Sequence, residues 1–322
     1  MVKMNIIDAV KSALDSELKR DKNVIVLGED VGKNGGVFRA TDGLFKKYGP
    51  KRIIDTPLTE EGILGNAVGL AVYGLKPVVE IQFSGFLAPA FDQIFTHAAR
   101  IRSRSRGRFT CPLVVRAPSG GGIRALELHC ECPEAFYAHM PGVKVVCPGT
   151  PYDAKGLLIS AIRDPDPVIF LEPMRIYRAV KQEVPTKAYT VPIGKANVVR
   201  KGNDLTIVTW GAMLKYTLET VENNKIDAEV IDLRTISPMD TETIIKSLEK
   251  TGRIMIVHEG CKTSGIGAEI SARINEKGLD YLEAPVIRVA GYDTALPFFK
   301  RELQYIPDEK RIMYGINKVL NY

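Results

Sequence analysis

The chain of 322 residues is 45% hydrophobic and 25% charged, which excludes a disordered protein and leaves room for two domains of ordinary size. Its formal net charge of +6 is modest for this length and gives no general argument for nucleic-acid binding. The first 20 residues mix apolar and charged side chains at helical spacing, a pattern of neither a signal peptide nor a membrane span.

The five cysteines indicate the compartment. Their number is odd and their spacing is unlike that of small secreted domains, so we expect reduced thiols in an intracellular protein. We therefore predict a cytoplasmic location. The mature form of an organellar protein, after removal of its targeting segment, would have the same composition, so an organellar location is the alternative.

The chain begins with an alternation of helices and strands. Residues 5–20 predict an amphipathic helix and Val24–Leu27 a short strand, which is followed by a Gly-Glu-Asp triplet. Residues 31–50 are rich in Gly and Lys and predict a long functional loop with one helical turn near Leu44.

The stretch 55–86 carries the strongest local pattern. An apolar period of about 3.6 residues begins at Glu60 and predicts a helix with a carboxylate in its first turn. Gly62, Gly65 and Gly69 fall near another face of this helix. Each glycine costs about 1 kcal/mol relative to Ala, which indicates a close approach of another backbone. From the residues alone, Glu60 is either an acid placed by the helix dipole or a functional carboxylate.

A buried strand and a basic segment follow. Residues 78–83 form an apolar run in which only Glu80 and Gln82 are polar, as in a strand covered on both faces. Residues 89–104 predict a helix, near whose end arginines alternate with other residues: Arg100, Arg102, Arg104, Arg106 and Arg108. These cations either complement the helix dipole on a solvated turn or contact a subunit or an acidic partner.

Three consecutive glycines at 120–122 predict a loop that a ligand can approach closely. The loop leads to the segment 127–134, which contains His129, Cys130 and Cys132. As a metal site this segment lacks a second Cys/His pair at zinc spacing, and as a thiol nucleophile it lacks an evident activating base. His129 is either an acid, base or hydrogen-bond donor beside the glycine-rich loop, or a structural histidine.

The first predicted domain spans residues 1–174. Its remaining strands are expected at 113–115, 143–146 and 168–171, with a helix capped by Thr150 that ends near Arg163. Residues 175–195 show no sustained period and form the predicted connector.

The second predicted domain spans residues 196–322. Strands are expected at 205–209, 227–231, 253–258 and 286–290, and helices at about 213–223, 239–250, 264–277 and 307–320. This alternation favours βαβ units, so we predict an α/β protein with mainly parallel sheets in both domains. The segment His258-Glu259-Gly260, at the carboxyl end of the third strand, either contacts a ligand or is an ordinary polar pair between a strand and a loop.

Three common motifs are absent from the sequence: G-x-G-x-x-G, the P-loop and G-x-S-x-G. Simple nucleotide-dependent and serine-hydrolase activities therefore lose support.

Seven segments together resemble one family: GED at 28–30, DTPLTEEGI at 55–63, GLKPVVEIQFSGF at 74–86, GGGIR at 120–124, HCECPEA at 129–135, TPYDAKGLL at 150–158 and DPVIFLEP at 166–173. They are similar to the beta subunit of the thiamine-diphosphate-dependent first component of 2-oxo acid dehydrogenase complexes, the pyruvate and branched-chain type. The resemblance covers essentially the whole chain.

The resemblance implies a transketolase-like fold whose N-terminal domain binds the pyrimidine of thiamine diphosphate. It implies that Glu60 contacts a ring nitrogen of the aminopyrimidine, where a carboxylate that shares a proton favours the imino tautomer, which deprotonates the thiazolium carbon. It also implies that Gln82 and Phe86 lie beside the pyrimidine, with Phe86 offering an aromatic face. His129 matches the active-site histidine, which lies near the substrate and the reductive acylation step.

The sequence departs from the family beside this histidine. The family usually has His-Ser-Gln-Ser where this chain has His-Cys-Glu-Cys. A carboxylate of Glu131 that faced the pocket would repel a 2-oxo acid, and one that faced His129 would favour the imidazolium. We therefore expect Glu131 to point away from the pocket or to pair with a cation.

By the same resemblance, four residues lie where relatives bind a structural potassium ion, mostly through backbone oxygens: Leu113, Ala161, Asp164 and Asp166. The alternative is that the turn at 164–166 simply ends a helix.

The chain lacks the family's diphosphate and Mg²⁺ motif, GDG followed by a distant Asn. The resemblance assigns that motif to a separate alpha subunit, and so implies an α2β2 heterotetramer whose cofactor sites are shared and whose Mg²⁺ is held mainly by the alpha subunit. The glycines at 62–69 then suit packing across a subunit boundary. The lipoyl acyltransferase core is a further implied partner, and we expect no nucleic-acid or membrane partner.

Two other functions remain open from the sequence. One is half of a two-chain transketolase-type transferase that acts on sugar phosphates, which would need basic pocket residues that the sequence does not locate. The other is a noncatalytic scaffold subunit. The preference for pyruvate or for a branched-chain 2-oxo acid is also open.

Overall fold

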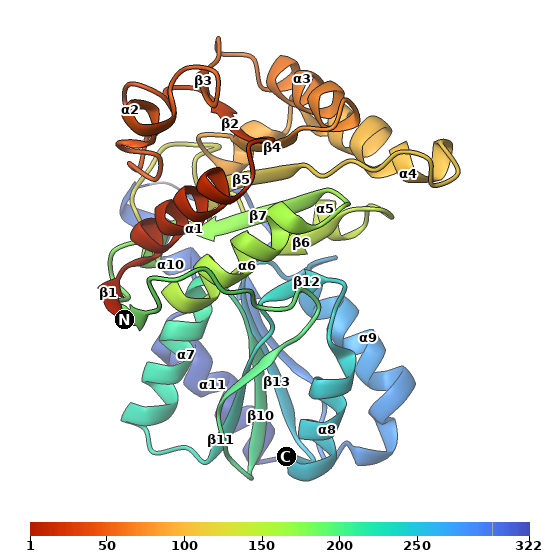
Figure 1. The fold of residues 1–322 in the computed structure, drawn as a ribbon. Helices are drawn as coiled ribbons and strands as arrows, with labels where there is room; N and C mark the ends of the chain where they lie inside the picture. Colours follow the sequence, from red (N-terminus) through yellow and green to blue (C-terminus); the bar gives the residue numbers. More distant parts are fainter. Residues whose placement is uncertain (298) are drawn as a thin grey trace.

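Two mainly parallel sheets organise the chain in the computed structural model, which describes residues 1–297 and 299–322 (Figure 1). The first sheet has seven strands, which are in spatial order β12 (Thr235–Ser237), β6 (Lys144–Val146), β7 (Val168–Pro173), β5 (Val114–Ser119), β4 (Lys76–Glu80), β2 (Val24–Gly28) and β3 (Ile53–Asp55). All neighbours in it are parallel except β12 and β6.

The second sheet has five strands, which are in spatial order β14 (Ile287–Gly291), β13 (Ile254–Cys261), β10 (Leu205–Thr209), β11 (Ala228–Asp232) and β9 (Asn197–Arg200). Only β9 runs antiparallel to its neighbour. The two-domain, mainly parallel α/β architecture expected from the sequence is therefore confirmed.

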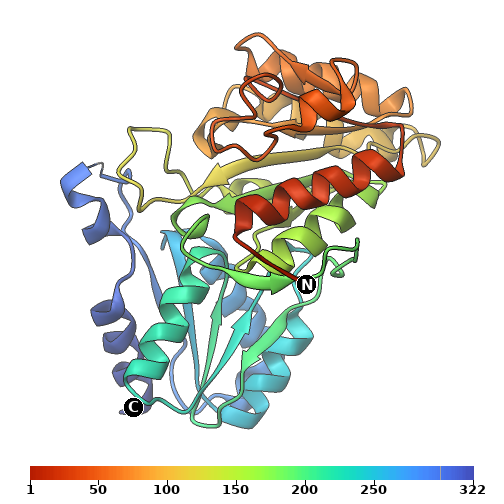
Figure 2. The same cartoon turned by 60° about the vertical axis from the view of Figure 1, so that its left-hand side comes forward.

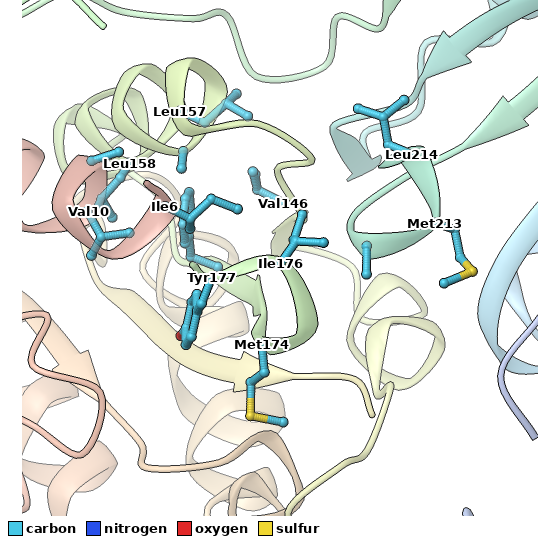
Figure 3. Packing of buried hydrophobic residues seen from close by; sticks show 14 of the residues in the cluster. Ile6, Val10, Val146, Leu157, Leu158, Met174, Ile176, Tyr177, Met213 and Leu214 are labelled. Carbon is cyan, nitrogen blue, oxygen red and sulfur yellow. The ribbon is translucent and has the colours of Figure 1, made fainter. Parts of the chain in front are cut away.

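Both faces of the first sheet are covered, because its strands are apolar at successive positions. In β2, Val24 and Val26 belong to the core beneath α1 (Ile6–Arg20) and α6 (Pro151–Arg163). Ile25 and Leu27 belong to the opposite core, beneath α3 (Glu60–Val72). Figure 3 shows side chains of α1 and α6 meeting in the first of these cores.

The second sheet is covered in the same way. Helices α7 (Ala212–Asn223) and α11 (Glu309–Leu320) contribute to one core, and α8 (Thr241–Thr251) and α9 (Ile266–Gly278) to the other. The first core continues between the domains, where Met174 and Ile176 lie near Met213 and Leu214 of α7 (Figure 3). No helix within the described ranges is long and apolar enough to cross a membrane.

The chain crosses between the two halves more than once. The connector contains β8 (Gln182–Val184), which pairs antiparallel with β1 (Val2–Met4). The buried amine of Lys155 donates hydrogen bonds to the carbonyl oxygens of Pro185 and Thr186 and so fixes the connector to α6. In addition, β12 from the second half of the chain forms the edge of the first sheet.

Two predicted elements differ in the structure. The helix expected at 89–104 is interrupted by a π-helical turn at Gln93–His97 and a 3₁₀ turn at Ala98–Arg100, which leaves α-helical geometry at residues 91–92 and in α4 (Ile101–Arg104). A π turn adds a residue, which a period of 3.6 does not reveal. The strand expected at 78–83 ends at Glu80, and a helical turn begins at Ser84.

Several short elements were not predicted. They are β1, β3, β8, β9, β12, α5 (Glu134–Ala138) and α10 (Glu302–Tyr305), each too short for a clear period. The predicted turn near Leu44 is present as α2 (Leu44–Tyr48). The predicted cap of α6 is also present, because the Thr150 hydroxyl accepts a hydrogen bond from the Asp153 N–H at 3.1 Å.

Candidate active site

The carboxyl ends of β2, β3 and β4 meet at one edge of the first sheet. Gly28, the last residue of β2, is paired with Asp55 on one side and with Glu80 on the other. The N–H of Thr56 donates a hydrogen bond to the carbonyl of Gly28 at 3.0 Å, which continues this edge beyond the strands. Open α/β sheets bind ligands at this edge, so the residues that follow these strands are candidates.

Glu60 and Glu29 lie close enough at this edge for the charge of Glu60 to act on Glu29. Glu60 is the half-buried first residue of α3, and the Thr59 hydroxyl caps the helix by accepting a hydrogen bond from the Gly62 N–H at 3.4 Å. Glu29 is only 9% exposed, and its burial, together with the carboxylates of Glu60 and Asp30, raises its pKa. Glu29 therefore holds a proton more readily than an exposed glutamate.

The aromatic rings of Phe83 and Phe86 pack against His129. Their centroids lie 4.3 Å and 4.9 Å from that of the imidazole. Phe86 belongs to the short helical turn Ser84–Leu87, directly beyond β4. A side chain on Gly85 would collide with the carbonyl oxygen of Leu128, so glycine lets this turn approach the His129 loop closely.

The tautomer of His129 follows from its hydrogen bond. Nδ1 lies 2.8 Å from the carbonyl oxygen of Glu127. A carbonyl oxygen only accepts, so Nδ1 carries a hydrogen, and in the neutral imidazole Nε2 is left with a lone pair that accepts a hydrogen bond or a proton. The imidazole is partly exposed, which suits a group that meets a ligand.

The structure brings some of the predicted site residues into contact and places others at the same edge. Phe86 touches His129, whereas Glu60 pairs with Glu29, which was not predicted. Gln82 follows β4 at the same edge of the sheet. Nearby in the chain, the hydroxyl of Thr56 is buried without a hydrogen-bond partner in the described parts of the chain. An orphaned hydroxyl of this kind fits a site that a polar ligand or another subunit completes.

Glu131 has an acidic neighbour rather than a basic one. Burial and the nearby carboxylate of Glu127 raise the pKa of Glu131. Its backbone carbonyl accepts hydrogen bonds from the Ser84 hydroxyl at 2.7 Å and from the Gly120 N–H at 3.0 Å. Among residues 1–297 and 299–322 Glu131 forms no ion pair, and its orientation away from the substrate stays a prediction.

The cysteines beside His129 do not form a reactive or metal-binding group. Burial raises the pKa of Cys130 to about 12 and raises that of Cys132 well above its usual value. Both are therefore poor nucleophiles at neutral pH. Within residues 1–297 and 299–322, no group of three or more His, Cys, Asp and Glu side chains is arranged to hold a metal ion.

Of the four residues predicted for potassium, Leu113 directly precedes β5, and Ala161, Asp164 and Asp166 lie at and just beyond the end of α6. The carbonyl oxygen of Leu113 accepts a hydrogen bond from the Val168 N–H at 2.9 Å, and that of Ala161 accepts one from the Asp164 N–H at 3.2 Å. Each carbonyl keeps one lone pair. The carboxylates of Asp164 and Asp166 are bound by Lys144 and Arg102, which leaves backbone oxygens as the donors that fit a cation.

The glycine face of α3 forms an open surface groove of about 770 Å³, which Gly62, Gly65, Gly69, Tyr73 and Gln93 line in part. A methyl group added to Gly69 would meet nothing within 4 Å. Tyr73 at the end of the helix is 88% exposed. The close backbone approach predicted for this face therefore does not occur within the described chain.

Sequence reasoning missed two residues of the site. Glu29 lies in the Gly-Glu-Asp triplet after β2, and its place at the end of a buried strand was the signal that could have found it. Phe83 was read as part of the strand 78–83, and only the turn after β4 reveals that it packs against His129.

Comparison with known proteins agrees with this geometry. The transketolase pyrimidine binding domain matches residues 2–180, and the transketolase C-terminal domain matches residues 194–312. The pyruvate dehydrogenase E1 component subunit beta of Acholeplasma laidlawii is 51% identical over 322 residues, covering 99% of this chain and 98% of that protein. The protein of the same name from Bacillus subtilis is 52% identical over 325 residues, with both chains fully covered.

A solved structure supports the fold. A split-gene transketolase, described as an inactive beta4 tetramer, superimposes with a TM-score of 0.80 at 23% identity, and the match covers 99% of this chain and 98% of that one. At this identity the match concerns the fold alone. Together with the full-length relatives, these findings show that the chain belongs to the family of beta subunits of the E1 component, the thiamine-diphosphate-dependent first component of 2-oxo acid dehydrogenases.

Proposed function

We propose that this chain forms half of a thiamine diphosphate site and, together with an alpha subunit, decarboxylates pyruvate and transfers the acyl group to a lipoyl group. The observation that carries the proposal is the pair of Glu60 and Glu29 at the carboxyl edge of the sheet in the pyrimidine binding domain. The names of the bacterial relatives favour pyruvate over branched-chain substrates.

Each residue has a defined task in this proposal. When bound, thiamine diphosphate supplies the electron sink for decarboxylation of the 2-oxo acid. Glu60 holds a proton against a pyrimidine ring nitrogen, and the neighbouring Glu29, whose pKa is raised by burial and by the carboxylate of Glu60, favours a proton at this edge of the sheet. Gln82 and Phe86 orient the pyrimidine. The Nε2 of His129, freed by the bond at Nδ1, takes or returns a proton near the substrate.

The other half of the site belongs to a partner. We propose an α2β2 heterotetramer in which the alpha subunit holds the diphosphate and most of the Mg²⁺ coordination. The orphaned Thr56 hydroxyl and the open groove along Gly62, Gly65 and Gly69 support a site and a helix face that another subunit completes. The lipoyl acyltransferase core is proposed to dock on the second domain.

A structural potassium ion is proposed at Leu113, Ala161, Asp164 and Asp166. The free lone pairs of the backbone carbonyls support it. The proposed location of the assembled enzyme is the cytoplasm.

The test uses the complex made by co-expression with the alpha subunit. Glu60→Gln removes the shared carboxylate with almost no change in shape, so we expect turnover of pyruvate to fall about 10²-fold or more while the complex still assembles. Glu309→Gln is the matched control, because Glu309 is also a first-turn acid of a helix but is exposed in the second domain. Full activity of Glu60→Gln would instead favour a noncatalytic scaffold. Assaying several 2-oxo acids, and a ketose phosphate, separates the substrate classes.

A further inference from the structure

The loop that carries His129 is held by a carboxylate from the other domain. Glu302, in α10, is completely buried. Its Oε1 accepts a hydrogen bond from the Gly122 N–H at 2.6 Å, and its Oε2 accepts one from the Arg124 N–H at 2.7 Å. Cys130, the residue after His129, also donates from its Sγ to Oε1 at 3.6 Å. One carboxylate therefore binds the loop on both sides of His129.

The backbone of the loop is shaped for this carboxylate. Gly122 and Arg124 have positive φ angles of 92° and 59°. Left-handed conformations of this kind let nearby N–H groups converge on one anion. Hydrogen bonds to a carboxylate are stronger than those to a neutral acceptor, and here they help to hold an otherwise uncommon conformation.

A second carboxylate from the same domain binds the next amide. Gly121 donates its N–H to Oε1 of Glu259, at the end of β13. The loop amides of Gly121, Gly122 and Arg124 are thus all taken by second-domain carboxylates. Figure 2 shows the chain around residue 125 beside the segment that contains α10, although the two are far apart in sequence.

The outer part of the loop is poorly buried. Its large apolar side chains, Ile123, Leu126 and Leu128, are 37%, 67% and 48% exposed. The base of the loop is closed by the bond from the Gly120 N–H to the Glu131 carbonyl. Between the base and the tip, the carboxylate of Glu302 joins the two limbs of the loop, and the Cys130 thiol also forms a hydrogen bond with the backbone of Ala125.

We propose that Glu302 is a positioning residue. From the second domain it holds the loop 120–131 of the first domain, so that His129 is correctly placed against the substrate. This inference rests on the proposed role of His129. It gives the second domain a part in the reaction, because a loop displaced by about 1 Å can lower turnover about 10²-fold.

The experiment compares Glu302→Gln with Glu309→Gln in the assembled complex. The side-chain amide of glutamine has only one oxygen, so it cannot accept hydrogen bonds from the N–H groups of both Gly122 and Arg124 in the way that the carboxylate does. We therefore expect faster backbone hydrogen exchange in the peptide 120–131 and unchanged exchange in β10 and β11. We also expect kcat to fall by about 10²-fold, while the affinity for thiamine diphosphate, which is assigned to Glu60 and its neighbours, stays the same. Glu309→Gln, an exposed acid on the next helix, should change neither quantity.

Unchanged exchange in 120–131 would overturn the inference, as would faster exchange with wild-type kcat. If Glu302→Gln does not fold, Gly122→Ala decides by the same two readouts, since a side chain at φ 92° is strained and would collide with Arg175. His129→Ala separates this inference from the proposed function. If His129→Ala is inactive but Glu302→Gln is not, only the inference fails, and if His129→Ala is fully active, the proposed role of His129 fails.

Discussion

The imidazole of His129 packs against the ring of Phe83, with the centroids 4.3 Å apart and the planes tilted by 54°. This contact and the bond from Nδ1 to Glu127 fix the direction of Nε2. We predict that His129→Ala lowers kcat by about 10²–10⁴-fold with little change in thiamine diphosphate affinity, because general acid–base groups contribute on this scale. Steady-state kinetics and cofactor titration of the complex measure both. His139→Ala, which removes an exposed histidine, is the control.

The charged network beneath the site should be a large determinant of stability. Arg116 is 1% exposed and binds Glu172 through Nε at 2.7 Å as well as Glu80. We predict that Arg116→Met lowers the free energy of unfolding by about 3–5 kcal/mol, because two buried carboxylates lose their partner. Urea unfolding tests this. Arg102→Met, in the exposed pair with Asp166, should change the free energy of unfolding far less than Arg116→Met does, and equal effects would contradict the argument.

His258 should make the chain sensitive to acid. Burial, and to a lesser extent the charge of Arg288, lowers the pKa of His258 from 6.5 to about 4, and neither ring nitrogen has a partner among the described residues. The unfolded chain therefore binds the proton more readily than the folded chain. Stability is fully present above pH 6.5 and is lost as the pH falls towards 4, at up to about 1.4 kcal/mol per pH unit.

The test of this pH dependence uses Trp210, the only tryptophan of the chain, whose ring stacks on His258 with centroids 5.2 Å apart. Unfolding of the purified chain is followed by tryptophan fluorescence between pH 4 and 7. We predict a flatter stability profile for His258→Phe. Parallel profiles for the variant and the wild type would show that other groups control the acid sensitivity.

Substitutions on the glycine face of α3 should affect folding and subunit assembly differently. Gly69 has open space around it, so Gly69→Ala should stabilise the isolated chain by about 1 kcal/mol through helix propensity. Gly69→Leu should fold equally well but weaken the heterotetramer, because its side chain would occupy the groove. Thermal unfolding and light scattering of the co-expressed complex measure the two effects. Wild-type assembly of Gly69→Leu would remove this face from the subunit contact.

Much of the fold follows from local sequence signals. The period that begins at Glu60 and the Thr150-Pro151 cap gave the correct starts of α3 and α6, because caps and apolar periods act within a few residues. The sequence did not reveal that β12 pairs with β6, since an edge strand of three residues has no period of its own. Contacts between distant segments of this kind depend on the tertiary fold.

The candidate site was predictable only in part. Glu60, Gln82, Phe86 and His129 were identified by resemblance, and their roles stay predictions. The proximity of Glu60 to Glu29 depends on the tertiary fold, because Glu29 follows β2 whereas Glu60 begins α3, beyond β3. The bonds from Glu302 to the His129 loop join residues 178 and 180 positions apart, and no local pattern indicates them.

The most direct test of the central claim is the rate at which the thiazolium hydrogen of bound thiamine diphosphate exchanges with deuterium in the assembled complex. If Glu60 shares a proton with the pyrimidine, Glu60→Gln should slow this exchange by about 10²-fold or more, while Glu309→Gln leaves it at the wild-type rate. Wild-type exchange in Glu60→Gln, with the cofactor bound, would contradict the account.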